Sequence, residues 1–108
     1  ELWSSDGGAA GTQRVLDLVP GAQGSLPREF RRAGGAIFFR ARTPAHGPEL
    51  WTSDGTAAGT ALVQDIEPGP FGSEPSQFAE ANGRLYFAAS TGAHRDRELW
   101  CSDGTSSG

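Results

Sequence analysis

Short apolar segments alternate along the chain with clusters of glycine, proline, asparagine and aspartate. Residues 76–81 and 85–89 are two such segments, and Asn82-Gly83 stands between them. Asn-Gly suits the type I′ turn of a β-hairpin, because both central residues of that turn need a positive φ. Residues 61–66 form a further segment rich in branched side chains. No segment keeps a helical period, so we predict an all-β chain of short antiparallel strands.

The tripeptide Glu-Leu-Trp marks an internal repeat. It occurs at residues 1–3, 49–51 and 98–100, each time followed by one residue and then by Ser-Asp-Gly, so the copies start 48 and 49 residues apart. A period of this size is that of a propeller blade built from four strands. We therefore expect β-propeller blades of four antiparallel strands, in a fragment of a larger repeat array.

This repeat divides the chain into three expected parts. Residues 1–27 supply the third and fourth strands of a first blade and an inter-blade loop. Residues 28–75 supply a complete blade and its inter-blade loop, and residues 76–108 supply the first three strands of a further blade. The loops at 43–48 and 91–97 differ between copies, whereas the Ser-Asp-Gly turns hardly differ. Binding sites favour variable loops on a fixed scaffold, so we expect the ligand face where these loops meet the inter-blade loops.

The repeat resembles that of the bacterial ELWxxDGT-repeat family, and its strand order resembles the kelch-type blade. The matching positions spread through the repeat and are residues 49–56, 59–60, 63, 65–66, 68–69, 72–73, 75, 78, 82–83 and 85–87. The resemblance implies a large, secreted or surface-exposed bacterial protein made of many such units. It implies no particular activity. The first copy departs from the motif at Gly8, where the motif has threonine.

Charge and composition narrow the class of partner. The net charge of −4 argues against nucleic acid or an anionic membrane as the main partner. No apolar run approaches the ~20 residues of a membrane-spanning helix. The single cysteine, Cys101, replaces a small polar residue of the other copies, and we interpret it as a free thiol. The expected partners are further repeats of the same protein, together with a glycan or a protein ligand.

Two recurring residue types favour a structural role. The tryptophans could stack on sugars, but their place within a strand favours packing between blades. The aspartates of the Ser-Asp-Gly turns could bind calcium, but each turn offers one carboxylate and Ca²⁺ prefers 6–8 oxygen ligands. We expect these aspartates to bond the amides of their own turn. The residues assigned to these structural roles are Trp3, Trp51, Trp100, Asp6, Asp54 and Asp103.

Asp17 and Asp65 precede the Pro-Gly pair that ends each fourth strand. Each could hold the Gly-Ser amides of the following loop, or join loop carbonyls in a calcium site. We expect no cofactor, with calcium at these aspartates as the alternative. The glutamates of the Glu-Leu-Trp copies are expected to pair with an arginine or with a backbone donor; they are Glu1, Glu49 and Glu98.

The candidate ligand-binding residues lie in the loops of one end of the blades. His46 and His94 occupy matching positions, but neither has other ligands at zinc spacing, which favours solvated loop histidines. The full candidate set is His46, Phe71, His94, Arg95, Asp96 and Arg97.

No nucleophile elbow, phosphate loop or Cys-x-x-Cys motif occurs, so we assign no catalytic residue. Nearly all of the candidate polar groups also recur from copy to copy, whereas an active site needs groups differentiated by environment. We therefore predict a non-enzymatic extracellular or cell-surface scaffold that mediates binding or adhesion. One alternative is a carbohydrate-binding propeller, and another is a hydrolase whose catalytic residues lie outside these residues.

Overall fold

The computed structural model describes residues 1–19, 24–91 and 96–105, and these residues contain strands and no helix. The all-β prediction is confirmed, and every strand pair is antiparallel. In chain order the strands are β1 (Leu2–Ser4), β2 (Gln13–Leu16), β3 (Arg28–Ala33), β4 (Ala36–Thr43), β5 (Gly47–Ser53), β6 (Ala61–Gln64), β7 (Ser76–Ala81), β8 (Arg84–Thr91) and β9 (Asp96–Ser102).

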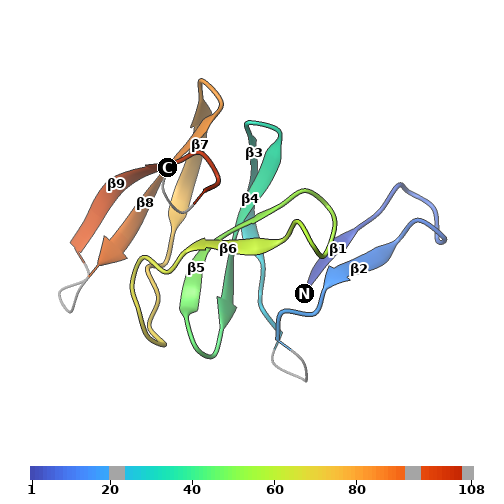
Figure 1. The fold of residues 1–108 in the computed structure, drawn as a ribbon, viewed down its shortest axis with the longest axis horizontal. Helices are drawn as coiled ribbons and strands as arrows, with labels where there is room; N and C mark the ends of the chain where they lie inside the picture. The colour runs from blue at the N-terminus through green and yellow to red at the C-terminus, as the bar shows by residue number, and fades with distance from the viewer. Residues whose placement is uncertain (20–23, 92–95, 106–108) are drawn as a thin grey trace.

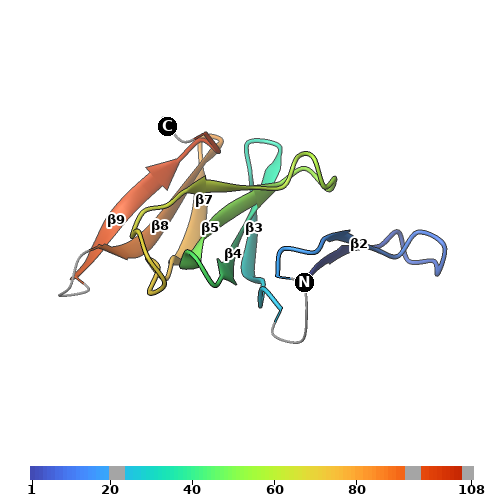
Figure 2. The same ribbon diagram turned by 60° about the horizontal axis from the view of Figure 1, so that its bottom comes forward.

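The strands form three separate sheets, ordered β1-β2, β3-β4-β5-β6 and β7-β8-β9. Within each sheet, strands that follow one another in the chain are also neighbours in space, so each sheet is a simple meander. Figures 1 and 2 show the sheets one after another across the molecule, with the four-stranded sheet in the middle. The meander places the turns after β3 and β5 at one end of this sheet. The β4–β5 loop lies at the other end, which we call the loop end.

The middle sheet is covered on both faces. Phe38 packs in one core cluster with Leu85 and Phe87 of β8, and Phe39 packs in a second cluster with Leu2 of β1. Consecutive strand residues point to opposite faces, which is why one Phe-Phe pair supplies both cores. Both rings are fully buried, and burial of each contributes about 1.5–3 kcal/mol. The apolar run at residues 36–39 of β4 therefore reflects a strand covered from both sides.

The hairpin turns follow the predicted chemistry. Asn82 and Gly83 have φ values of 53° and 77°, and Gly34 and Gly35 have values of 59° and 84°. The two turns also touch each other, since a Cβ built on Gly34 would lie 2.6 Å from the carbonyl oxygen of Gly83. Glycine at position 34 thus lets the tips of neighbouring sheets meet, and β3 lies next to β7.

Two predicted boundaries are wrong. The segment expected to run through residues 61–66 ends as β6 at Gln64, because the N–H of Ile66 turns back to the Gln64 carbonyl at 3.0 Å. The loop expected at 43–48 is shorter, since Thr43 and Gly47 are paired residues of β4 and β5 and only residues 44–46 lie between the strands. Gly47 has a φ of 67°, which suits a three-residue hairpin loop.

None of the described residues forms a helix with the length and apolar character needed to cross a membrane.

Candidate functional site

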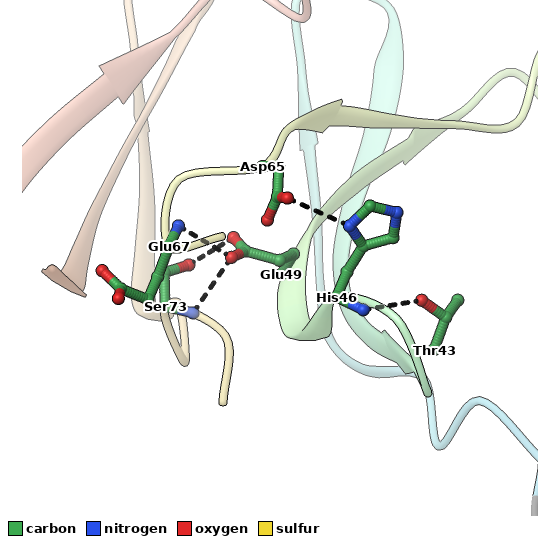
Figure 3. A network of polar contacts seen from close by, with 6 residues as sticks. All are labelled: Thr43, His46, Glu49, Asp65, Glu67 and Ser73. Atoms are coloured by element: carbon green, nitrogen blue, oxygen red, sulfur yellow. Dashed lines mark hydrogen bonds and ion pairs between the residues drawn. The ribbon is translucent and has the colours of Figure 1, made fainter. Parts of the chain in front are cut away.

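Figure 3 shows two groups of polar contacts, both from the middle sheet and the loop that follows it. One group joins Asp65, His46 and Thr43, and the other is a network that holds the loop after β6. Its centre is Glu49, a fully buried carboxylate on β5. Glu49 Oε1 accepts the N–H of Glu67 at 3.0 Å and the N–H of Ser73 at 3.2 Å. Glu49 Oε2 accepts the hydroxyl of Ser73 at 2.6 Å. The carboxylate thus fixes both ends of the loop that leaves β6.

Ser73 also joins the middle sheet to the next one. Its carbonyl oxygen accepts the N–H of Ser90 on β8 at 2.8 Å. Together with its two bonds to Glu49, this gives Ser73 partners in two sheets. We call the arrangement of Glu49, Ser73 and Ser90 the Glu–Ser joint.

A matching joint, without the serine hydroxyl bond, occurs one repeat earlier. Glu1 Oε1 accepts the N–H of Leu18 at 2.5 Å, and Glu1 Oε2 accepts the N–H of Ser25 at 2.7 Å. The carbonyl of Ser25 then accepts the N–H of Arg42 on β4 at 2.9 Å. Glu98, at the matching position on β9, is exposed and accepts no hydrogen bond from the described residues.

The Glu–Ser joint bears on two expectations from the sequence. One concerns which carboxylate holds the loop after each fourth strand, and the other concerns the partners of Glu1 and Glu49. One of the two roles considered for Asp17 and Asp65 was to hold the Gly-Ser amides, but the serine amides, those of Ser25 and Ser73, are bonded by Glu1 and Glu49. The glutamate side chain is one methylene longer, and it projects from the neighbouring strand toward the loop. Of the two partners expected for Glu1 and Glu49, the structure shows backbone donors and no arginine within the described residues.

The pKa values of Glu49 and Glu1 are shifted in opposite net directions. Desolvation raises the pKa of Glu49 to about 7, and the nearby Asp65 carboxylate adds to this effect, against the lowering by hydrogen bonds from Ser73 and Glu67. For Glu1, burial also raises the pKa, but backbone hydrogen bonds outweigh it and the net pKa is lowered. Glu1 is less buried than Glu49, so its charged form is the more stable of the two.

The aspartates after each fourth strand lie near side chains that can donate a hydrogen bond. Asp65 Oδ2 lies 3.1 Å from His46 Nδ1, with both side chains about one-third exposed. Asp17 Oδ2 lies 3.7 Å from Arg14 Nη1. His46, which we expected to be a solvated loop histidine, thus keeps partial exposure and also meets Asp65, 19 positions away in the sequence. The described residues contain no group of three or more histidine, cysteine, aspartate or glutamate side chains placed to hold a metal ion.

The Ser-Asp-Gly turns satisfy their own polar groups. Asp54 Oδ1 accepts the N–H and the hydroxyl of Thr56 at 2.9 and 2.7 Å, and Asp103 bonds Thr105 in the same way. These bonds, led by that of the Thr56 hydroxyl, lower the pKa of Asp54. Asp6 accepts only the N–H of Gly8, because glycine replaces the threonine there.

The tryptophans differ in burial. Trp51 is 8% exposed and packs in the core cluster between the first and middle sheets, the environment that the packing interpretation requires. Trp100 is half-buried and packs against the cluster between the middle and third sheets. Trp3 is 58% exposed in the described structure.

Of the candidate ligand-binding residues, the structure describes the side chains of His46, Phe71 and Arg97. Phe71 is 69% exposed at the loop end. Arg97 is bonded within the third sheet, with its Nη2 donating to the carbonyls of Ala88 and Glu74 at 3.1 and 3.2 Å. His94 and Arg95 lie outside the described residues, and so does the side chain of Asp96.

A cleft of about 180 Å³ opens at this end between successive loops. Val19 and Gly24 line it from the first inter-blade loop, and Pro70 lines it from the second. The β4–β5 loop lies between them, and sequence reasoning missed the cleft because its walls come from three separate segments.

A search of protein-family models, of curated proteins and of solved structures finds no match for this chain.

Proposed function

We propose that this chain is part of a β-propeller that serves as a non-enzymatic binding or adhesion scaffold outside a bacterial cell or on its surface. The observation that carries the proposal is the Glu–Ser joint, which links the first sheet to the middle sheet and the middle sheet to the third. A device that recurs at each boundary between stacked sheets suits a radial array of blades. The neighbouring positions of β3 and β7 suit strands that line a central channel. The extracellular or cell-surface location is inferred from the resemblance of the repeat to the ELWxxDGT family.

The use of the recurring carboxylates supports a scaffold over an enzyme. Glu49 holds an inter-blade loop, and Asp54 holds its own turn. Both groups are engaged in bonds that maintain architecture. The β4–β5 loop differs in sequence from its copy, and at this end of the sheet Phe71 and the cleft beside Pro70 are accessible.

Carbohydrate binding is the second candidate, and the exposure of Phe71 favours it. An exposed aromatic ring can stack on the face of a sugar ring. The first copy has Gln23 at the position of Phe71, so weak sites would gain affinity through multivalency only with other copies that carry an aromatic residue there. Phe71 adjoins Pro70 of the cleft wall, so a ring stacked on Phe71 would lie close to this cleft.

Binding of the purified protein to arrays of glycans and of surface proteins tests the proposal. We expect Phe71→Ala to weaken binding, and the matched change Thr56→Ala at the opposite end to leave it unchanged. A ligand lost only on substitution of Thr56 would overturn the assignment of the binding face. Electron microscopy of the intact protein should show rings with a central channel, and an open stack of sheets would reject the propeller.

A further inference from the structure

A second cleft, of about 230 Å³, opens on the middle sheet at its loop end. Arg28 from β3 and Arg40 and Arg42 from β4 line it. Arg28 and Arg40 are paired residues of the two strands, and Arg42 follows on the same face of β4. No carboxylate lines the cleft, and within the described part of the chain none of the three guanidinium groups forms an ion pair. Three adjacent positive charges therefore lie in an accessible cleft of an acidic protein.

In the third sheet, the place that matches this cleft is occupied by the side chain of Arg97. Pro48 of the middle sheet corresponds to Arg97, because Arg42 pairs with Pro48 just as Ser90 pairs with Arg97. The Arg97 guanidinium donates to the hydroxyls of Ser76 and Ser90 and to the carbonyl of Ala88. These three residues occupy the repeat positions of the three cleft arginines. In the third sheet a cation thus sits among neutral acceptors at this place.

The middle sheet reverses this arrangement. Proline at position 48 carries no guanidinium to fill the cleft. The two hydroxyl acceptors, Ser76 and Ser90, are replaced by Arg28 and Arg42, and Arg40 stands at the position of Ala88. A guanidinium presents paired N–H donors that match the oxygens of a carboxylate, sulfate or phosphate. The repeated parts of the chain build architecture, whereas this charge pattern belongs to one sheet alone among the described residues.

From this contrast we infer that Arg28, Arg40 and Arg42 bind an oxyanion, the carboxylate, sulfate or phosphate group of a larger ligand. The inference deepens the proposed binding function, because the cleft adjoins the loop end and shares Arg42 and Pro48 with the neighbouring cleft. It does not depend on closure of a propeller, since a single sheet supplies all three arginines.

Calorimetric titration of the intact protein with sodium sulfate, sodium phosphate and sodium acetate tests the inference. Ionic strength is held constant with sodium chloride, so that general screening is the same throughout. We expect saturable binding of at least one oxyanion. Arg28→Ser and Arg42→Ser introduce the residues that the third sheet carries at the same positions, so the fold is expected to tolerate them. Each should weaken binding about tenfold, the loss typical of a charge-assisted hydrogen bond.

Arg31→Gln is the matched control, because Arg31 lies on the same strand but does not line the cleft. It should leave the affinity unchanged. The inference is overturned if no oxyanion binds saturably, or if Arg31→Gln weakens binding as much as Arg28→Ser does. Tighter binding of sulfate and phosphate than of acetate would assign a sulfate or phosphate ester, and the reverse a carboxylate. If an oxyanion binds saturably but the arrays show no ligand, the proposed function is contradicted and the oxyanion site is still supported.

Discussion

The Ser73 hydroxyl donates to Glu49 Oε2 at 2.6 Å, and both groups are fully buried. This bond links β5 to a loop residue 24 positions later, at the point where the chain passes from one sheet to the next. The carboxylate also receives two backbone N–H groups, so most of its acceptor capacity is used without a charged partner. The pair therefore sets how the middle and third sheets are joined.

Replacement of the Ser73 hydroxyl should weaken this joint. We expect Ser73→Ala to lower the free energy of unfolding by about 1–3 kcal/mol, because a buried acceptor loses its partner. Ser25→Ala is the matched control, since Ser25 Oγ is buried but has no hydrogen-bond partner among the described residues. Urea unfolding of both variants makes the comparison. Equal losses would show that the hydroxyl bond to Glu49 contributes nothing specific.

Glu49 should make stability depend on pH. Its pKa is raised in the folded state from 4.5 to about 7, so the folded protein binds a proton more tightly than the unfolded chain does. The contribution is fully present below pH 4.5 and is lost as the pH rises through 7, with a total of up to about 3 kcal/mol. We expect the urea concentration at the unfolding midpoint to decrease as the pH is raised from 5 to 8. Glu49→Gln should flatten this dependence, and an unchanged slope in that variant would assign it to other groups.

Trp51 should contribute strongly to the core. Trp51→Ala is expected to cost about 3–5 kcal/mol, as large-to-small changes at buried aromatic residues do. Trp3→Ala, at the matching position of the first copy, should cost less than about 1 kcal/mol because Trp3 is largely exposed. Thermal unfolding of the two variants tests this. A small loss at Trp51 with diminished glycan binding would favour the stacking role instead.

Gly59 should be intolerant of a side chain. A Cβ built there would lie 2.0 Å from Asp54 Oδ1, so the carboxylate rests directly on the glycine. Gly59→Ala should destabilise the protein by about 1–3 kcal/mol through overpacking. The double change Asp54→Ala with Gly59→Ala should cost less than the sum of the single changes, since each relieves the other. Strict additivity in this cycle would contradict the proposed contact.

Sequence reasoning succeeded where the determinants are local. Asn82-Gly83 dictates its turn through positive φ values, and Asp54 finds its donors within two residues. It failed where partners are distant along the chain. Asp65 is nearer to Ser73 in sequence than Glu49 is, so the wrong carboxylate was assigned to the loop. The recurrence of glutamate and serine in both copies was the available signal, but recurrence alone does not say which residues meet.

The cleft arginines show a second limit. Their individual positions are visible in the sequence, but they become neighbours only through the pairing of Arg28 with Arg40. That register includes a bulge between Arg28 and Arg31, with Glu29 at a φ of 57°. A one-residue shift would send a strand side chain to the other face, so such a cluster cannot be deduced without the bulge.

The placement of the Glu–Ser joint within the repeat bears on how such chains grow. Glu49, Ser73 and Ser90 all fall inside one sequence copy, which begins at one sheet and ends in the next. Duplication of that copy in the gene would therefore reproduce a boundary between sheets together with its hydrogen bonds. Each added copy would bring its own means of attachment, and the chain could lengthen without evolving a new contact surface.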